Sequence, residues 1–137
     1  MKVIFIGAGN VATHLASVMD SAGFEIIQIF SQTIESAKAL SEKLSKKPAY
    51  INQIDQIDNG ADLYVFSIKA SALQEVVSRI EPNSGIWAHT AGSMSIDLFG
   101  GYAKRFGVIY PLQTFSKNKT VDWTNIPIFL EASDTDT

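Results

Sequence analysis

The chain has 137 residues, of which 46% are hydrophobic and 18% charged, and its formal net charge is −3. This length and composition predict one globular domain with a sizeable core and exclude an intrinsically disordered chain. The weak negative charge and the lack of a basic stripe with interleaved aromatics argue against nucleic acid or an anionic membrane surface as a partner.

Cellular location follows from what the sequence lacks. There is no cysteine, so disulfides and thiolate metal sites are excluded, and a reducing compartment is allowed. The first expected strand begins near residue 2, which leaves no room for a cleaved signal segment, and no apolar run approaches the length of a membrane span. We therefore expect a cytoplasmic protein.

The chain opens with a strand, a glycine turn and a helix. The run Val3–Ile6 is apolar, β-branched and aromatic, which is typical of a strand buried on both faces. It ends at the Gly7-Ala8-Gly9 turn. Apolar residues then recur at helical spacing, at Ala12, Leu15, Ala16 and Met19. This order is typical of the βαβ unit that binds dinucleotides.

The turn fits the dinucleotide fingerprint G-x-G-x-x-G/A. Gly7 permits the tight turn, Gly9 lets a pyrophosphate approach the backbone, and Ala12 is the third small position, where the helix packs on the strand. Free N–H groups of the first helical turn would face the phosphates, and Asn10 either caps the helix or contacts a phosphate. The alternatives are a strand–turn–helix unit that only packs, or an inherited site that no longer binds.

The second strand bears on the choice of cofactor. It is predicted over Glu25–Phe30, after Gly23, which suits a left-handed helix end. NAD-specific domains place an acid near the end of this strand to bind the ribose 2′-hydroxyl. Here the strand ends in Ser31-Gln32-Thr33, with no acid until Glu35. Hydroxyls and an amide can hydrogen-bond a 2′-phosphate that a carboxylate would repel, so we expect NADP rather than NAD.

Strands and helices alternate along the rest of the chain. Further helices are predicted over Thr33–Ser45, Gln53–Asp58, Leu73–Ile80 and Met94–Phe99. Further strands are predicted over Ala49–Ile51, Asp62–Ile68, Gly85–His89, Phe106–Ile109 and Ile126–Leu130. The alternation predicts an α/β fold over residues 1–137, a doubly wound, mainly parallel sheet of the Rossmann type, in a single domain.

Ligands of such sheets bind outside the carboxyl ends of the strands. The candidate site is therefore made of the segments that follow the strands, which are Gly7–Ala12, Ser31–Thr33, Ser67–Ser71, His89–Ser93 and Tyr110–Phe115. His89 could donate a proton to substrate, or could instead bond a backbone carbonyl and shape its loop. Lys69 could contact a ribose or a substrate carboxylate, or be solvated.

Other polar residues carry weaker expectations. Thr90 and Ser93 could bond the carboxamide of nicotinamide or cap the next helix, and Gln113 and Thr114 could face substrate. His14 is expected to be exposed. No cluster of His, Asp and Glu has metal-ligand spacing, so no metal site is predicted.

Three segments carry a resemblance to a known family. GAGNVA at Gly7–Ala12, HTAGS at His89–Ser93 and YPLQTFSK at Tyr110–Lys117 resemble two-domain NADP oxidoreductases whose activity is only provisionally assigned. Their first half is similar to pyrroline-5-carboxylate reductases and deazaflavin-dependent NADP reductases, and their second half is an all-helical, dimer-forming domain. The likeness covers essentially residues 1–137. It implies that the helical domain, and with it the homodimer interface, lies outside this chain.

The resemblance also implies residue roles. The pyrophosphate would be held by Gly7, Ala8, Gly9, Asn10, Val11 and Ala12, and the adenosine 2′-phosphate by Ser31, Gln32 and Thr33. The nicotinamide ribose would be lined by Ser67, Ile68 and Lys69, and the nicotinamide approached by His89, Thr90, Ala91 and Gly92. Many relatives carry Pro-Asp after the fourth strand, where this chain has Lys69-Ala70-Ser71.

Two functions are compatible with these residues. The first is the NADP-binding domain of an oxidoreductase that transfers hydride between NADP(H) and a small carbonyl or imine-type substrate, with His89 and Lys69 as catalytic candidates. The alternative is a non-catalytic nucleotide-binding sensor or assembly module, which is favoured by the lack of an assured proton donor.

Overall fold

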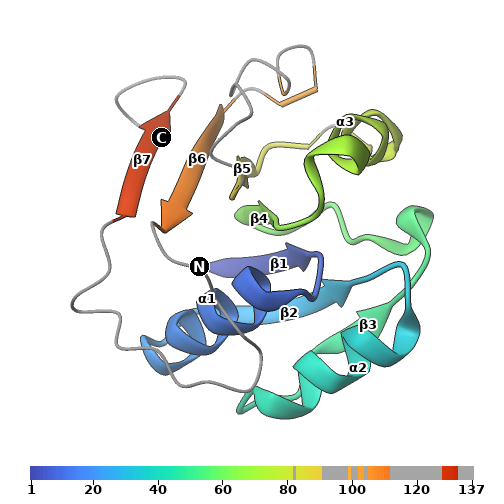
Figure 1. Ribbon diagram of the computed structural model, residues 1–137, viewed down its shortest axis with the longest axis vertical. Coiled ribbons are helices and arrows are strands. Elements are labelled where there is room, and N and C mark those ends of the chain that lie inside the picture. The colour runs from blue at the N-terminus through green and yellow to red at the C-terminus, as the bar shows by residue number, and fades with distance from the viewer. Residues whose placement is uncertain (82, 91–98, 100–101, 104, 112–127, 133–137) are drawn as a thin grey trace.

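The computed structural model describes residues 1–81, 83–90, 99, 102–103, 105–111 and 128–132. Within them, one sheet has the strand order β3-β2-β1-β4-β5-β6-β7 (Figure 1). The strands are β1 (Lys2–Ile6), β2 (Glu25–Phe30), β3 (Ala49–Ile51), β4 (Leu63–Phe66), β5 (Ile86–His89), β6 (Arg105–Pro111) and β7 (Ile128–Ala132). Strands β1 to β6 pair in parallel, and β7 is antiparallel to β6. The predicted mainly parallel α/β sheet is confirmed.

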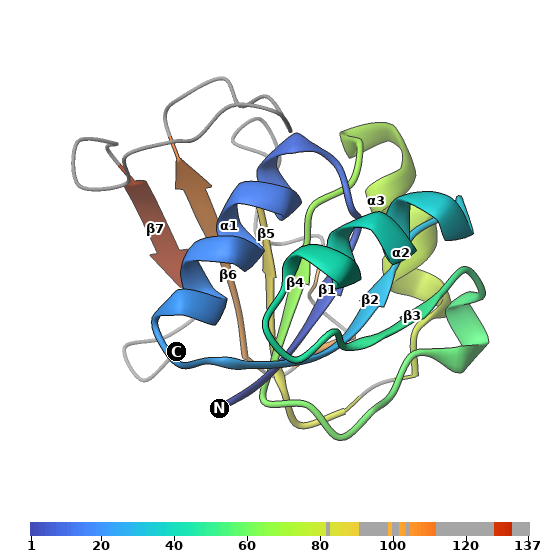
Figure 2. The same ribbon diagram turned by 90° about the horizontal axis from the view of Figure 1, so that it is seen from below.

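Helices cover both faces of this sheet. They are α1 (Asn10–Ser21), α2 (Ile34–Lys43) and α3 (Ala70–Arg79), and a 3₁₀ turn, η1 (Ile54–Gln56), precedes β4. Figure 2 shows α1 and α2 on one face and α3 on the other. The chain therefore winds to both sides of β1, as a doubly wound fold requires.

Strand β1, which lies between β2 and β4, separates two halves of the core. Val3 and Phe5 lie in one cluster with α1 and α2, whereas Ile4 and Ile6 lie in a second cluster with α3. All four side chains are fully buried. Successive side chains of a strand point to opposite faces, which is why a continuous apolar run was the correct signal for this position. Burial of each such side chain stabilises the fold by about 1.5–3 kcal/mol.

Tyr64 anchors the loop that enters β4. Its hydroxyl donates to the carbonyl oxygen of Asp58 at 2.7 Å and accepts the N–H of Ala61 at 3.2 Å. Burial raises the pKa of the Tyr64 hydroxyl, because a buried phenolate would lose its hydration; the nearby carboxylates of Asp58 and Asp62 act in the same direction. This end of the sheet lies opposite the carboxyl ends of the parallel strands, so the contact belongs to the fold rather than to the ligand crevice.

The last strand is described over Ile128–Ala132 and runs antiparallel to β6; residues 126 and 127, where it was expected to begin, lie outside the described residues. His14 is 8% exposed, so the expectation that it is exposed was wrong. The reason is that α1 buries five consecutive residues, Ala12 to Ala16, and therefore more than one helical face. The helix predicted over Met94–Phe99 lies outside the described residues, apart from Phe99 itself.

Candidate functional site

At the carboxyl edge of the sheet, four strands are each followed by one more backbone hydrogen bond to the neighbouring strand. The residue that follows a strand donates its N–H to a carbonyl of the neighbouring strand. The four bonds are Ser31 to Ile51 (3.1 Å), Gly7 to Phe30 (2.7 Å), Ser67 to Ile6 (2.7 Å) and Thr90 to Phe66 (3.1 Å). Four of the five predicted segments therefore begin along one edge of the sheet.

A pocket of about 300 Å³ opens at this edge. It is lined by residues that follow three strands, β1, β2 and β4, and by the end of β2 and the first turns of α3. These residues are Gly7, Ala8, Gly9, Phe30, Ser31, Gln32, Thr33, Ser67, Ile68, Lys69, Ala72 and Val76. Three of the predicted segments thus meet in one cavity. Phe30, Ala72 and Val76 were not predicted, because apolar residues at strand ends and on a helix have the same pattern as core residues.

Gly7 and Gly9 have different roles in the turn after β1. Gly7 has φ +115°, and a Cβ at this position would lie 2.2 Å from the carbonyl oxygen of Ser67. Gly9 has φ −81°, and a Cβ there would meet nothing within 4 Å. Gly7 is therefore required by the fold, whereas the space beside Gly9 is open to a ligand.

Helix α1 begins directly after Gly9, which lines the pocket. Gly9 is the N-cap, and no side chain caps the helix. The first backbone bond of the helix runs from the Thr13 N–H to the Gly9 carbonyl at 2.9 Å, and the Thr13 hydroxyl donates to the same carbonyl at 2.7 Å. The N–H groups of Asn10, Val11 and Ala12 precede this bond, and with the helix dipole they favour an anion.

The structure gives the positions of two residues of the fingerprint, Asn10 and Ala12. Asn10 is exposed and is the first helical residue, so the alternative in which it caps the helix was wrong. Ala12 is fully buried in the cluster that holds Val3 and Phe5, which confirms it as the small residue where helix and strand pack.

The segment after β2 offers neutral hydrogen-bonding groups to the pocket. Ser31 is 9% exposed, and its Oγ accepts the N–H of Thr33 at 3.4 Å. The Thr33 hydroxyl donates to the Ser36 hydroxyl at 3.2 Å, and Gln32 is exposed. No carboxylate is among the described residues that line the pocket.

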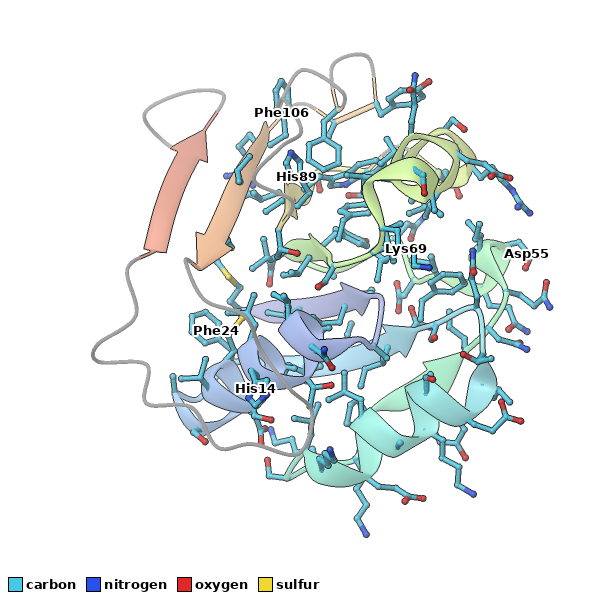
Figure 3. The ribbon with its side chains drawn as sticks, in the orientation of Figure 1. His14, Phe24, Asp55, Lys69, His89 and Phe106 are labelled. Atoms are coloured by element: carbon cyan, nitrogen blue, oxygen red, sulfur yellow. The ribbon has the colours of Figure 1, made fainter. Side chains whose placement is uncertain are left out.

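The segment after β4 forms the opposite wall. The Thr90 hydroxyl donates to Ser67 Oγ at 3.2 Å, which links the ends of β5 and β4. Lys69 precedes α3, is exposed, and is the one charged residue among the described lining residues. In Figure 3 its side chain extends from the start of α3 into the space beside the segment that follows β2.

His89 lies apart from this pocket. Its side chain is fully buried at the end of β5, and its ring lies 5.6 Å from that of Phe99, centroid to centroid. It belongs to an aromatic cluster with Phe66, Trp87 and Phe106 (Figure 3). The predicted site residues Ala91, Gly92, Ser93 and 112–115 lie outside the described residues.

In the part of the chain that the structure describes, no three or more His, Cys, Asp or Glu side chains are grouped as they would be to hold a metal ion. None of the helices there has the length and apolarity needed to cross a membrane.

Solved structures share this fold. An NADP oxidoreductase from Bacteroides fragilis, so named provisionally, is 39% identical, with a TM-score of 0.88 over 98% of this chain and 52% of its own. Prephenate dehydrogenase from A. aeolicus is 15% identical, with a TM-score of 0.71 over 95% of this chain and 50% of its own. Pyrroline-5-carboxylate reductase from Streptococcus pyogenes is 20% identical, with a TM-score of 0.63 over 81% of this chain and 42% of its own.

The similarity to prephenate dehydrogenase and to pyrroline-5-carboxylate reductase is one of fold alone. The chain spans about half the length of the first two of these structures, and no curated protein matches it. A family model described as NADP oxidoreductase, coenzyme F420-dependent, matches residues 2–90, which include the turn after β1 and two walls of the pocket. The chain therefore belongs to the coenzyme F420-dependent NADP oxidoreductase family.

Proposed function

We propose that this chain is the NADP-binding domain of an oxidoreductase that transfers hydride between NADP(H) and a small carbonyl or imine-type substrate. The observation that carries the proposal is the pocket at the carboxyl edge, which joins the fingerprint turn to other described lining residues, none of which is a carboxylate. The family supplies the reaction class, because its members are described as NADP oxidoreductases.

Two features of the pocket support a dinucleotide as its ligand. Open space beside Gly9 and the uncapped start of α1 suit a pyrophosphate, which needs close approach to the backbone and N–H donors. We assign Gly7–Ala12 to this group. We assign Ser31, Gln32 and Thr33, which line the pocket, to the adenosine 2′-phosphate, and the lack of an acid among them supports NADP over NAD.

The remaining roles concern the nicotinamide end. When bound, the nicotinamide ring carries the hydride, and the protein has to orient it and exclude water. We assign Ser67 and Ile68 to the nicotinamide ribose, and His89, Thr90, Ala91 and Gly92 to the approach to the ring. Ser67 is well suited, since the Thr90 hydroxyl already donates to its Oγ and leaves the Ser67 proton for an acceptor on the ligand.

A second candidate function is favoured by the burial of His89. A fully buried imidazole, tilted at 47° to the ring of Phe99, fits the alternative in which His89 shapes its loop rather than donating a proton. Without a proton donor, the domain would bind the nucleotide as a sensor or assembly module. The partners that we propose for the oxidoreductase are a small-molecule substrate and, through a part of the relatives that this chain does not cover, a second copy, in the cytoplasm.

The test combines titration with turnover. The chain is titrated with NADPH and NADH, and the protein with its C-terminal half is then assayed for NADPH oxidation with aldehydes, ketones, cyclic imines and oxidised coenzyme F420. Tighter binding of NADPH together with turnover supports the oxidoreductase. Tight binding without turnover on any acceptor favours the sensor, and lack of binding of either nucleotide would contradict both.

A further inference from the structure

We infer that Lys69 selects NADP by placing its ammonium on the adenosine 2′-phosphate, from the wall of the pocket opposite the end of β2. The inference rests on the proposed function and adds to it the residue that reads the phosphate. It also assigns to Lys69 a role different from contact with the nicotinamide ribose.

The first step is one of charge. A phosphate monoester carries about −1.5 to −2 charges at neutral pH, and NADP sites accommodate the 2′-phosphate with an arginine near the end of the second strand. Here that segment supplies hydroxyls and an amide but no cation. Lys38 and Lys43 lie on the exposed side of α2, and neither is among the residues that line the pocket. The positive charge in the described lining comes from Lys69.

The second step is one of placement. Ser31, Gln32 and Thr33 line one side of the cavity, and Lys69 lines it together with Ala72 and Val76 from α3. A cavity of about 300 Å³ brings the two walls within the reach of one ligand. The view in Figure 3 agrees, since the Lys69 side chain leaves the start of α3 toward the segment that follows β2.

The third step is the availability of the ammonium. Lys69 is exposed, and none of the described residues that line the pocket with it is a carboxylate. Its side chain also makes no capping hydrogen bond with α3. Lysine is a compact charge on a flexible stem, so it can follow a phosphate without fixed geometry. The apolar Ala72 and Val76 beside it reduce competition from water and strengthen the attraction.

Two other contacts are compatible with the same cavity, and they predict different outcomes. An ammonium on the pyrophosphate would serve every adenine dinucleotide equally. An ammonium on a substrate carboxylate would affect neither nucleotide. Only a contact with the 2′-phosphate separates ligands that differ in that group alone.

The experiment uses two such ligands, 2′,5′-ADP and 5′-AMP, titrated calorimetrically into wild type and Lys69→Gln. Lys43→Gln is the matched control, because Lys43 is an exposed lysine of α2 that does not line the pocket. We expect Lys69→Gln to weaken the binding of 2′,5′-ADP about tenfold or more, because the substitution removes a charge-assisted hydrogen bond. AMP affinity should stay unchanged, Lys43→Gln should alter neither ligand, and Lys69→Arg should keep most of the preference.

Other results would overturn the inference. Equal weakening of both ligands would place Lys69 on the 5′-phosphate, and no change in either would remove it from the nucleotide site. Thermal melting of each variant shows whether the fold is intact. A wild-type chain that binds neither ligand would contradict the proposed function itself, which is a different result from a wild type that binds both and is unaffected by Lys69→Gln.

Discussion

A Cβ on Gly7 would lie 2.2 Å from the carbonyl oxygen of Ser67. The contact arises because the Ser67 N–H donates to the Ile6 carbonyl at 2.7 Å, which draws the end of β4 directly against the turn after β1. The same turn leaves the position of Gly9 open. One glycine of the fingerprint is therefore required by the packing of the sheet, and the space beside the other is open.

The first prediction concerns Gly7. Gly7→Ala adds a Cβ where φ is +115° and a backbone oxygen stands 2.2 Å away. Left-handed strain of about 1–2 kcal/mol and overpacking of about 1–3 kcal/mol should together lower the free energy of unfolding by roughly 3 kcal/mol. Urea denaturation followed by circular dichroism measures this loss. A variant as stable as wild type would show that the turn does not pass against β4 in this way.

A second prediction tests the neutral segment after β2. Ser31→Asp places a carboxylate at the pocket and keeps an acceptor for the Thr33 N–H, which Ser31 Oγ now accepts at 3.4 Å. Repulsion should weaken NADPH binding at least about tenfold, and it should leave NADH unchanged or bound more tightly. Ser31→Asn is the control, because it has the same shape without the charge. Equal losses for both nucleotides in Ser31→Asp would place the 2′-phosphate elsewhere.

The third prediction concerns Tyr64, which lies far from the pocket. Tyr64→Phe removes the group that bonds the Asp58 carbonyl at 2.7 Å and the Ala61 N–H at 3.2 Å. The free energy of unfolding at pH 7 should fall by about 1–2 kcal/mol. Tyr50→Phe is the control, since Tyr50 is 40% exposed on β3 and should be neutral.

The same substitution has a pH signature. Burial raises the folded-state pKa of Tyr64 above the value of about 10 that applies to the unfolded chain. Between the unfolded and the folded pKa of Tyr64, the folded protein binds more protons than the unfolded chain does. The stabilisation is therefore complete below about pH 10 and is lost as the pH rises through the folded pKa. Wild type should lose stability more steeply than Tyr64→Phe above about pH 10. Identical slopes in denaturation curves recorded from pH 9 to 11 would contradict the burial of this hydroxyl.

The fold could be predicted because its signals are local and repeated. Val3–Ile6 is an apolar run followed by a glycine turn and a helical pattern, and the structure places it inside the sheet, between β2 and β4. The direction of β7 was not predictable in this way, because a strand has the same side-chain alternation in either direction. The burial of His14 was missed for a related reason. Helix α1 is covered on more than one face, and the spacing of its polar residues does not indicate the additional buried positions.

The predicted segments that line the pocket are those whose position follows from the ends of the strands. Gly7–Gly9, Ser31–Thr33 and Ser67–Lys69 follow the strands at one edge, and all three segments line the pocket. Ala72 and Val76 were missed, because a helical residue that faces a ligand and one that faces the core carry the same apolar spacing. His89 is the reverse case, in which a polar residue after a strand marked an expected site but lies fully buried beside Phe99.

The most direct test of the nucleotide site is the titration of Gly9→Val with NADPH, with Gly9→Ala as a smaller step. A Cβ at Gly9 would meet nothing within 4 Å, so circular dichroism and the urea midpoint should remain close to those of wild type. The side chain does occupy the space that we assign to the pyrophosphate, so NADPH affinity should fall about a hundredfold or more in Gly9→Val and less in Gly9→Ala. A folded Gly9→Val chain that binds NADPH as wild type does would show that the dinucleotide does not lie against the turn after β1.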